Sequence, residues 1–557
     1  MSDLALPTSD TKARVKTAIP DQVDVAIVGA GLGGLMSAAR LAKRGLKVAV
    51  FDGHYVAGGC ATMFHRATRD GRYQFDVGVH YIGDCGPEGK IPTLLREVGV
   101  EIEYVRMDDD GFDTIVVPDV TFPIPADLAR FRDRLVEFFP SEKKGIDLYT
   151  RVLGEVAHMG HYMDNRRGRG VAASLGMMWQ VATRARLVPR YQHATIANLL
   201  DDCTRDPTLR AVLLGQSGDY GVAPSKASAM MHLGLQAHYL RGAYYPKGGG
   251  QRIADELADV VEANGGAICL RRTVERILVE GGRAVGVRLA AGRDGGREVR
   301  AGVVISNADL KRTYDELLPP DVAPKAWRDR APSLQMGAAL VTMCVGVKGN
   351  LRDFGMAARN IWRFTTTDAE EVYAEVDRGE LTGRCAYITS ASLKDPDTHG
   401  HTPPGVMGLE IMTLAPGKPE AWGVGRGDVD NGGYRKSEIY AAKKLAIEDR
   451  LIDQLEAQFP GIKPHIVFRE SATPLTHTRY TRATDGTGYG LAATPGQFMQ
   501  ARPGYRGPIP GLYFTGANTR AGHGVSGALN SGKHTAAKVM EDREATPGRV
   551  SPAQGPR

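Results

Sequence analysis

The stretch Val23-Asp24-Val25-Ala26-Ile27-Val28-Gly29-Ala30-Gly31-Leu32-Gly33-Gly34 decides the fold of this chain. Its first half is a β-branched apolar run, which predicts a buried strand, and apolar residues then recur at helical spacing from Leu35 to Leu46. A second strand-like run at residues 47–51 ends at the acidic Asp52. This order of strand, glycine turn, helix and strand is a β-α-β unit. The sequence therefore begins with a nucleotide-binding half.

The glycines of this turn match the G-x-G-x-x-G pattern of dinucleotide-binding proteins. The first permits a tight turn, the second lets backbone N–H groups approach a pyrophosphate, and the third allows close packing of helix and strand. The phosphate then lies at the positive end of the helix, and Asp52 is placed to accept hydrogen bonds from a ribose diol. The alternative is a glycine turn that binds nothing. The residues expected to hold the nucleotide here are Gly29, Ala30, Gly31, Leu32, Gly33, Gly34 and Asp52.

FAD and NAD share this pattern, so other glycine-rich segments have to distinguish them. Ala57-Gly58-Gly59-Cys60-Ala61-Thr62 follows Asp52, and Gly516-Ala517-Asn518 runs into Gly522-His523-Gly524-Val525-Ser526-Gly527 and a second helix. That helix N-terminus would favour negative charge at the flavin N1/O2 edge, where charge accumulates on reduction. The order of these segments predicts FAD. The further residues expected to contact it are Gly58, Gly59, Ala61, Thr62, Val79, Gly516, Ala517, Gly524, Val525 and Ser526.

The nucleotide-binding segments are interrupted twice by long stretches rich in helical patterns. We therefore predict an α/β fold with a discontinuous Rossmann-type FAD-binding domain and an interleaved α+β substrate domain. The FAD-binding domain is expected to comprise residues 21–106, 242–309 and 471–543. The substrate domain is expected to comprise 107–241 and 310–470, and we expect flexible termini at 1–20 and 544–557.

Composition excludes several other classes. A chain of 557 residues exceeds the size at which one hydrophobic core stops growing, so two domains are expected. With 70 basic and 64 acidic residues, the net charge of +6 is too small to suggest a nucleic-acid partner. The six cysteines form no CxxC pair and no cluster with metal-ligand spacing, so we expect reduced thiols and no metal site.

The cellular location is predicted from two kinds of segment that the sequence does not contain. The first 20 residues contain no apolar core of the kind found in signal peptides. No run reaches the roughly 20 apolar residues needed to cross a bilayer. We therefore expect a cytoplasmic protein.

These motifs resemble the carotenoid desaturase, carotenoid isomerase and retinol saturase family of FAD-dependent flavoproteins, within the wider amine-oxidase-like superfamily. Gly58-Gly59-Cys60 and Phe75-Asp76-Val77-Gly78-Val79-His80-Tyr81-Ile82-Gly83 look most like the retinol saturase branch. The resemblance extends to Tyr244-Tyr245-Pro246-Lys247-Gly248-Gly249, Ser306-Asn307-Ala308-Asp309 and Thr473-Pro474-Leu475-Thr476. It covers the nucleotide-binding segments well and the helical segments poorly.

The resemblance implies one FAD across the discontinuous domain, with backbone contacts from Val274 to adenine. It also implies chemistry on carbon–carbon double bonds of a long apolar polyene or isoprenoid. It places His80 and Tyr81 near the isoalloxazine, where either could donate or accept a proton beside hydride transfer. The alternative is structural, a histidine bonded to backbone and a tyrosine that packs the cleft. Asp219-Tyr220 and His232 are further candidates.

Several functions remain open beside an FAD-dependent saturase or desaturase. Flavin-assisted cis-trans isomerisation and amine oxidation use related chains. A non-enzymatic isoprenoid-binding chaperone, like the GDP dissociation inhibitors, is also compatible with this fold, although the intact glycine block at 516–527 speaks against it. No second G-x-G-x-x-G with a trailing acidic residue is present, so the electron donor or acceptor is external and unknown.

A basic-flanked apolar segment offers two interpretations. Arg166, Arg167 and Arg169 precede the apolar run at 171–179, and Arg184, Arg186 and Arg190 follow it. Such a helix would suit a peripheral membrane contact, where an apolar small-molecule substrate enters from lipid. It would equally suit a helix that lines an internal cavity.

Overall fold

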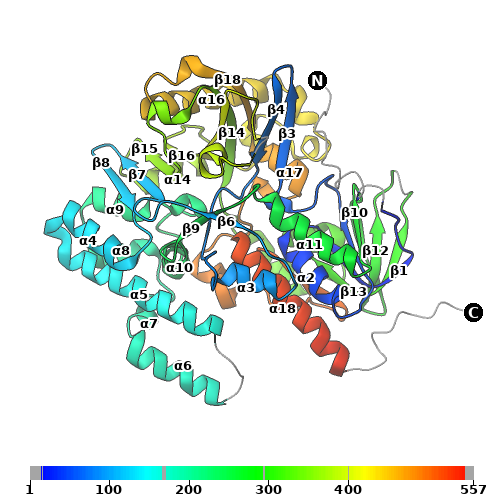
Figure 1. The fold of residues 1–557 in the computed structure, drawn as a ribbon. Helices are drawn as coiled ribbons and strands as arrows, with labels where there is room; N and C mark the ends of the chain where they lie inside the picture. The colour runs from blue at the N-terminus through cyan, green and yellow to red at the C-terminus, as the bar shows by residue number, and fades with distance from the viewer. Residues whose placement is uncertain (1–13, 15–16, 166–170, 293–294, 399–400, 546–557) are drawn as a thin grey trace, which may run out of the picture.

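The chain folds around two large sheets that lie in different halves of the molecule (Figure 1). The computed structural model describes residues 14, 17–165, 171–292, 295–398 and 401–545. Most of the termini expected to be flexible, 1–20 and 544–557, therefore lies outside the described residues. In Figure 1 the first sheet is at the right and the second at the upper left.

The first sheet is built on the β-α-β unit. Its order is β10-β2-β1-β13-β12-β11, and β19 pairs with β13. β10, β2, β1, β13 and β19 pair in parallel, whereas β12 is antiparallel to both neighbours. The strands are β1 (Gln22–Val28), β2 (Val48–Asp52), β10 (Ala267–Leu270), β11 (Val274–Glu280), β12 (Arg283–Leu289), β13 (Glu298–Ser306) and β19 (Leu512–Phe514). The predicted α/β fold with a Rossmann-like sheet is confirmed.

The central strand β1 is covered on both faces, as parallel strands usually are. Val25 and Ile27 belong to the core beneath the helices, and Ala26 and Val28 belong to the core on the opposite face. The β11–β12 hairpin turns at Gly281-Gly282, whose φ angles of 54° and 73° suit a two-residue I′ turn. Burial on both faces explains the apolar run in the sequence, and the tight turn explains the glycine pair.

Helix α2 (Leu32–Ala42) is held between α11 (Gln251–Ala263) and α18 (Gly524–Ala545), and α3 (Lys90–Arg96) packs on α18. Gly532 permits the close approach of α18 to α2. A Cβ at Gly532 would lie 2.6 Å from the Gly33 carbonyl oxygen and 2.7 Å from Met36 Cβ. The N-terminal turn of α2 is therefore fixed by the C-terminal helix of the chain.

The second sheet contains strands where the sequence pattern had suggested mainly helices. Its order is β18-β14-β17-β16-β15-β7-β8. β17 is buried at eight successive positions, so it lacks the alternation that would have marked it as a strand. The strands are β7 (Asp113–Val117), β8 (Val120–Ile124), β14 (Ala339–Lys348), β15 (Asn360–Phe364), β16 (Cys385–Thr389), β17 (Val406–Ala415) and β18 (Ile466–Ala472).

Helices cover this sheet, and small sheets connect the two halves. The helices of the left-hand layer in Figure 1 are α4 (Leu128–Phe138), α5 (Lys143–Asn165), α6 (Val171–Arg184), α7 (Val188–Tyr191), α8 (Ile196–Cys203), α9 (Pro207–Leu214) and α10 (Ala229–Tyr239). The others are α12 (Leu310–Arg312), α13 (Lys325–Arg330), α14 (Ala369–Asp377), α15 (Ala391–Lys394), α16 (Glu438–Gln458) and α17 (Pro474–Thr481). The small sheets are β3 (Met63–Thr68) with β4 (Gly71–Asp76), and β5 (Ile82–Gly83), β9 (Ala243–Pro246) and β6 (Tyr104–Arg106).

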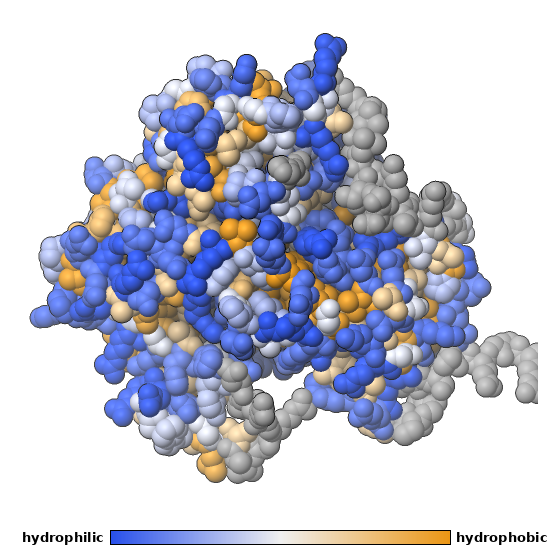
Figure 2. Space-filling model, in the orientation of Figure 1, coloured by the Kyte–Doolittle hydropathy of each residue, from blue (hydrophilic) through white to orange (hydrophobic). Residues whose placement is uncertain are grey.

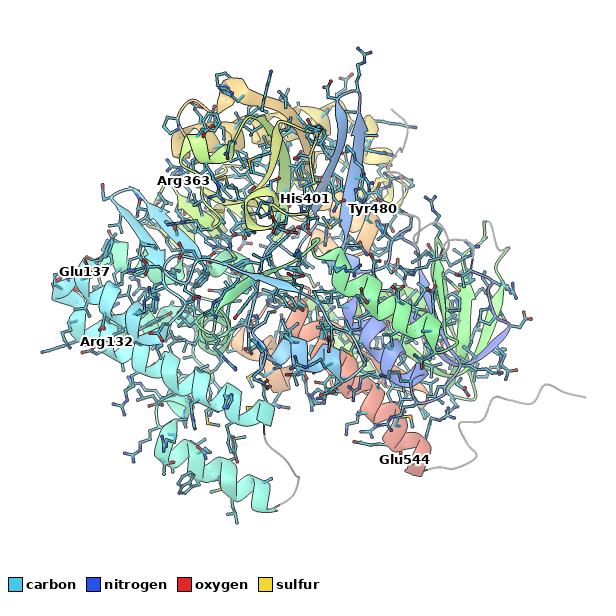
Figure 3. The ribbon with its side chains drawn as sticks, viewed as in Figure 1. Arg132, Glu137, Arg363, His401, Tyr480 and Glu544 are labelled. Carbon is cyan, nitrogen blue, oxygen red and sulfur yellow. The ribbon has the colours of Figure 1, made fainter. Side chains whose placement is uncertain are left out.

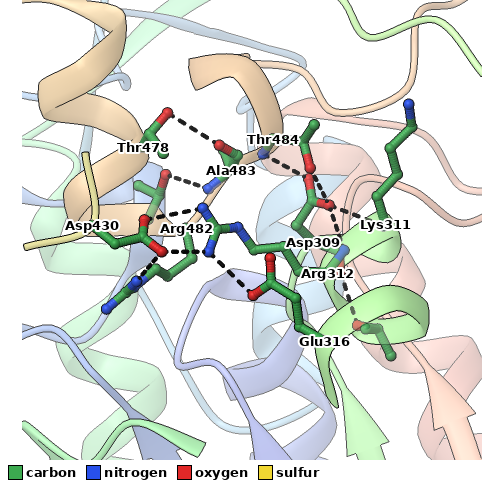
Figure 4. Close-up of polar contacts among 11 residues, drawn as sticks. Asp309, Lys311, Arg312, Glu316, Asp430, Thr478, Arg482, Ala483 and Thr484 are labelled. Carbon is green, nitrogen blue, oxygen red and sulfur yellow. Dashed lines mark hydrogen bonds and ion pairs between the residues drawn. The ribbon is translucent and has the colours of Figure 1, made fainter. Parts of the chain in front are cut away.

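A polar joint ties the end of β13 to the second half (Figure 4). Asp309 Oδ1 accepts hydrogen bonds from the backbone N–H groups of Lys311 and Arg312, which caps α12. It also accepts a bond of 2.8 Å from the Thr484 hydroxyl, just beyond α17. Arg312 in turn forms a bidentate pair with Asp430, at 2.9 and 3.0 Å.

Replacing Asp309 by alanine is expected to destabilise the protein by about 1–3 kcal/mol, because a helix cap and a bond to Thr484 are lost together. The free energy of unfolding from urea titration measures this loss. Asp315→Ala is the matched control, since Asp315 is exposed on the neighbouring turn. Equal stability of both variants would show that the joint adds nothing.

Candidate active site

One large cavity joins the glycine-rich loops of the first sheet to the face of the second sheet. Its volume is about 1860 Å³, whereas pockets for drug-sized ligands have about 300–1000 Å³. Tyr480 lines this cavity and lies where the two halves meet, as Figure 3 shows. The space is therefore large enough for a dinucleotide and a second molecule together.

Backbone forms the cradle at one end of the cavity. Gly29 has a φ of 98° and Gly58 a φ of 133°, values that other residues rarely adopt. A Cβ at Gly33 would lie 2.8 Å from Asn307 Oδ1 and 2.9 Å from Gly516 Cα. The first turn of α2 and the loop at Gly516 approach each other only because Gly33 has no side chain.

The N-terminus of α2 is open to a ligand. Gly31 is its N-cap and provides no side-chain hydrogen bond, and the first turn contains no acidic residue. The first N–H groups of a helix need an acceptor, and the helix dipole favours an anion there. Gly31, Gly33 and Gly516 keep side chains out of the space in front of this turn. The residues present therefore fit the pyrophosphate of a dinucleotide.

Asp52 has a structural role beyond the one its position suggested. Its Oδ2 accepts the Ala30 N–H at 2.7 Å, and its Oδ1 accepts the His54 N–H at 2.7 Å. The carboxylate therefore shapes the glycine turn itself. It also lines the cavity, and each carboxylate oxygen can accept a further bond.

The structure brings nearly all sequence-predicted residues to this one cavity. Ala30 and Gly34 do not line it, and neither do the further candidates Tyr220 and His232. The Ala30 carbonyl instead accepts the Gly58 N–H at 2.8 Å, and Gly34 packs on the Gly29 carbonyl. The cavity-lining residues are Gly29, Gly31, Leu32, Gly33, Asp52, Gly58, Gly59, Ala61, Thr62, Val79, His80, Tyr81, Val274, Gly516, Ala517, Gly524, Val525 and Ser526.

His80 lies between the cavity and a buried charged cluster. Burial, with the charge of Lys394, lowers the pKa of His80 to about 3, so the imidazole is neutral. Its carbonyl oxygen accepts a bond of 2.5 Å from Lys394 Nζ. Its Nε2 has no hydrogen-bond partner among the described residues. His80 is therefore free to bond a ligand but is not a charged acid.

The charged cluster behind His80 was not expected from the sequence. Ligand-type atoms of Asp76, His80 and Glu410 lie within 4.8 Å of one another among the described residues. The charge of Lys394 acts on all three groups, so this cluster already contains a cationic side chain. The absence of a metal site remains a prediction.

Tyr81 joins two buried carboxyl groups. Its hydroxyl lies 3.0 Å from Asp113 Oδ2 and 2.7 Å from Asp219 Oδ2. Its ring stacks on Tyr239, with centroids 4.3 Å apart. Asp113 opens the buried strand β7, where the sequence gave no signal for a functional carboxylate, whereas Asp219 was a candidate. Tyr81 and Asp219 line the cavity.

His232 and Tyr220 pair with each other away from the cavity. The Tyr220 hydroxyl contacts His232 Nδ1 at 3.0 Å, and the Tyr149 hydroxyl contacts Nε2 at 2.9 Å. All three side chains are fully buried in the helical core. Because these side chains bond one another and do not reach the cavity, we interpret them as structural residues.

Comparison with known proteins gives relatives over nearly the whole chain. The all-trans-retinol 13,14-reductase of Danio rerio is 30% identical over 553 residues, which cover 94% of this chain and 87% of that protein. The Homo sapiens protein of the same name is 27% identical, with 89% and 82% covered. The chloroplastic prolycopene isomerase of Daucus carota is 26% identical, with 94% and 80% covered.

Solved structures share the fold. A crystal structure of an oxidoreductase from Methanosarcina mazei has a TM-score of 0.61 at 20% identity, covering 93% of this chain and 100% of that one. A putrescine oxidase double mutant has a TM-score of 0.58 at 16% identity, covering 94% and 100%. At these identities the likeness concerns the fold alone.

Two family models match parts of the chain. One is described as an NAD(P)-binding Rossmann-like domain and matches residues 27–98. The other is described as a flavin containing amine oxidoreductase and matches residues 429–540. The expected cofactor FAD and the expected oxidoreductase class are confirmed. The chain belongs to the flavoprotein family of the all-trans-retinol 13,14-reductases and prolycopene isomerases.

Proposed function

We propose that this chain reduces a carbon–carbon double bond of a long apolar polyene. The observation that carries the proposal is the single cavity, which continues from the glycine cradle to an apolar wall on the second sheet. Retinoid and carotenoid names among the relatives agree with such a substrate. Isomerisation of the same substrate is the alternative, since some relatives are named as isomerases.

The far wall of the cavity suits a flat, conjugated chain. Trp362 and Tyr387 pack with ring centroids 4.5 Å apart, and Met230 and Met231 of α10 line the same cavity. Aromatic faces and flexible methionine side chains adapt well to an extended hydrocarbon. The apolar and aromatic residues that line this part are Met230, Met231, Leu235, Tyr239, Leu340, Trp362, Phe364, Val372, Tyr387, Met412 and Leu414.

FAD supplies hydride chemistry when it is bound and reduced. In this proposal the α2 N-terminus and the Gly58–Gly59 backbone hold its pyrophosphate, Asp52 its ribose, and Val274 its adenine. The helix that begins at Gly524 stabilises negative charge on the flavin. The two chain halves exclude water from the space between the cofactor and the apolar wall. The domain boundaries predicted above remain part of the proposal.

Helix α6 offers a route for an insoluble substrate. Leu175, Met178 and Trp179 share one helix face and are 59%, 67% and 58% exposed. The apolar atoms at the lower tip of the molecule in Figure 2 lie over α6. Arg184, Arg186 and Arg190 flank this face, whereas Arg166, Arg167 and Arg169 lie outside the described residues.

The position of α6 links this apolar face to the cavity. His158 on α5 contacts Gln180 on α6 at 2.8 Å, and α5 residues Val156, Ala157 and Gly160 line the cavity. No helix among the described residues has the length and apolar character needed to cross a membrane. We therefore include in the proposal that α6 rests on an anionic lipid surface, and that substrate enters beside α5.

The function is tested with chemically reduced holoenzyme and all-trans-retinol under anaerobic conditions. We expect the flavin absorbance to return as a product with two additional hydrogen atoms forms. Prolycopene whose geometry changes without a change of mass would support the isomerase instead. Retinol left unchanged, together with bleaching of oxidised enzyme by putrescine, would contradict both and indicate an amine oxidase.

Asp52→Ala is expected to weaken FAD binding by roughly 10- to 150-fold, because a charge-assisted hydrogen bond to the ribose is lost. Its bonds to the Ala30 and His54 N–H groups are lost too, so the apoprotein should also unfold at lower temperature. Fluorescence titration with FAD and thermal unfolding measure the two effects. Asp70→Ala, an exposed change in the β3–β4 turn, is the control. An unchanged FAD affinity would remove Asp52 from the site.

The triple change Leu175→Ser, Met178→Ser and Trp179→Ser is expected to reduce binding to anionic liposomes at least about 10-fold, because three apolar side chains no longer enter the lipid. Cosedimentation with phosphatidylserine vesicles measures it, and higher salt should weaken wild-type binding. Ile439→Ser with Leu445→Ser, exposed on α16, is the matched control. Equal binding by all three proteins would return α6 to a role in the cavity wall.

A further inference from the structure

We propose that Asp219 is the general acid that delivers a proton to the polyene, and that Tyr81 and Asp113 hold it in the protonated state. The inference rests on the proposed function and names the residue that completes the reduction. Asp219 ends the short helix η3 (Ser217–Asp219) and lines the cavity together with Tyr81, Tyr239 and Trp362.

The local fold presses η3 against the second sheet. A Cβ at Gly218 would lie 2.4 Å from Trp362 Cζ3, so only glycine lets this turn pack on the indole. The carbonyl oxygen of Gly218 accepts a bond of 2.6 Å from the Tyr489 hydroxyl. The backbone that carries Asp219 is thereby held in place on both sides of Gly218.

The contacts among Tyr81, Asp113 and Asp219 depend on how many hydrogen atoms these three side chains carry. The Tyr81 hydroxyl carries one hydrogen, yet its oxygen lies within hydrogen-bond distance of both Asp113 Oδ2 and Asp219 Oδ2. The hydroxyl can donate to one carboxyl group. The other contact is a hydrogen bond only if that carboxyl group carries its own proton. When both contacts are full hydrogen bonds, one of the two carboxyl groups is a carboxylic acid.

We assign the proton to Asp219, because Asp113 is supplied with other donors. Burial raises the pKa of Asp113 as well, and hydrogen bonds from its neighbours oppose that rise. Asn360 Nδ2, Gln216 Nε2 and Trp362 Nε1 donate to Asp113 at 2.8, 2.7 and 3.2 Å. Each of these atoms can only donate, so Asp113 must accept, and an ionised carboxylate accepts best. Tyr81 donates to Asp113, and the Asp219 O–H donates to Tyr81.

The surroundings of Asp219 favour its neutral form. Burial and then the negative charge of Asp113 raise the pKa of Asp219 to about 7, while the hydroxyl groups of Tyr81 and Tyr239 beside it lower that pKa. Burial, aided by the charge of Arg502, lowers the pKa of His523 to about 3, so that ring is also neutral. The titratable groups that act on Asp219 or that it acts on are Asp113, His523, Tyr81, Tyr220, Tyr239, Tyr373, Tyr387 and Tyr489.

His80, the other candidate, does not provide this proton. Its neutral imidazole would have to release an N–H proton, which is far less acidic than a carboxylic acid. Its Nε2 remains available to bind a ligand. Tyr81 is likewise a positioning residue, because its hydrogen is given to Asp113.

The reaction balances with these groups. The π bond of one C=C would break; one carbon would receive the hydride and electron pair that reduced FAD supplies, and the other carbon would receive the Asp219 proton. Two C–H bonds would form, FAD would be left oxidised, and Asp219 would be left as a carboxylate beside Tyr81. After product release, Asp219 would take up a proton from bulk solvent.

The protonation state is tested by infrared spectroscopy of FAD-loaded protein without substrate. We expect a carboxylic-acid C=O band that disappears as pH rises through about 7 and that is absent in Asp219→Asn. Asp202→Asn is the matched control, because Asp202 also accepts a bond from a tyrosine hydroxyl but lies outside the cavity. Because burial raises the pKa of Glu410 to about 8, the band is read from the difference between the wild-type and Asp219→Asn spectra. A difference spectrum without this band at pH 6 would overturn the proposal.

The catalytic role is tested by single turnover of reduced holoenzyme with all-trans-retinol. The single-turnover rate constant of the wild type should fall as pH rises through about 7, because the carboxyl group loses the proton it donates. Asp219→Asn should be slower by about 10²–10⁴-fold and lose this pH dependence, with FAD affinity unchanged. Tyr81→Phe should shift the pH midpoint and retain more activity.

Two results separate this inference from the function on which it rests. If no polyene is reduced by any variant, the infrared band still decides whether Asp219 holds a proton. If polyene is reduced and Asp219→Asn keeps the wild-type rate and pH profile, the general acid is another group and the proposal fails.

Discussion

The contact between the first turn of α2 and the loop at Gly516 is the constraint on which the rest of the structure depends. Backbone meets backbone there, since a Cβ on Gly33 would lie 2.9 Å from Gly516 Cα. The contact joins the first and last parts of the chain, and Gly532 holds α18 against the same turn. It also keeps an uncapped helix end open to the cavity. Without it the cofactor would have no fixed position relative to the second sheet.

A chain of polar contacts continues from this cradle into the second sheet. Asn360 donates to Asp113 and accepts a bond from Lys394 at 3.2 Å, so one amide links the tyrosine-bridged carboxyl pair to the charged cluster behind His80. Buried polar groups are costly unless each is bonded. These bonded groups lie beside the apolar wall, since Trp362 belongs to that wall and also donates to Asp113.

The sequence could predict the glycine cradle well and the far end of the cavity poorly. The sequence signal is clear at residues 29–34, at Asp52 and in the terminal glycine block, because backbone geometry limits which residues can occupy these positions. β17 and Asp113 gave no such signal, since a fully buried strand has no alternation and its carboxylate is bonded to residues far away in sequence. Asp52 shows a third case, in which the expected bond to the ribose stays a prediction and the bonds to backbone N–H groups were not foreseen.

The polar residues around Asp219 come from separate segments of the chain. Tyr81 comes from the segment that follows the cofactor loops, whereas Asp113, Asp219 and Trp362 come from three separate stretches of the second half. Their hydrogen bonds therefore form only when both halves are folded and packed. The same packing forms the cavity that joins the cradle to the apolar wall. A proton held by a carboxyl group between the two halves thus lies beside the space in which a hydride and a proton can be added to the same double bond.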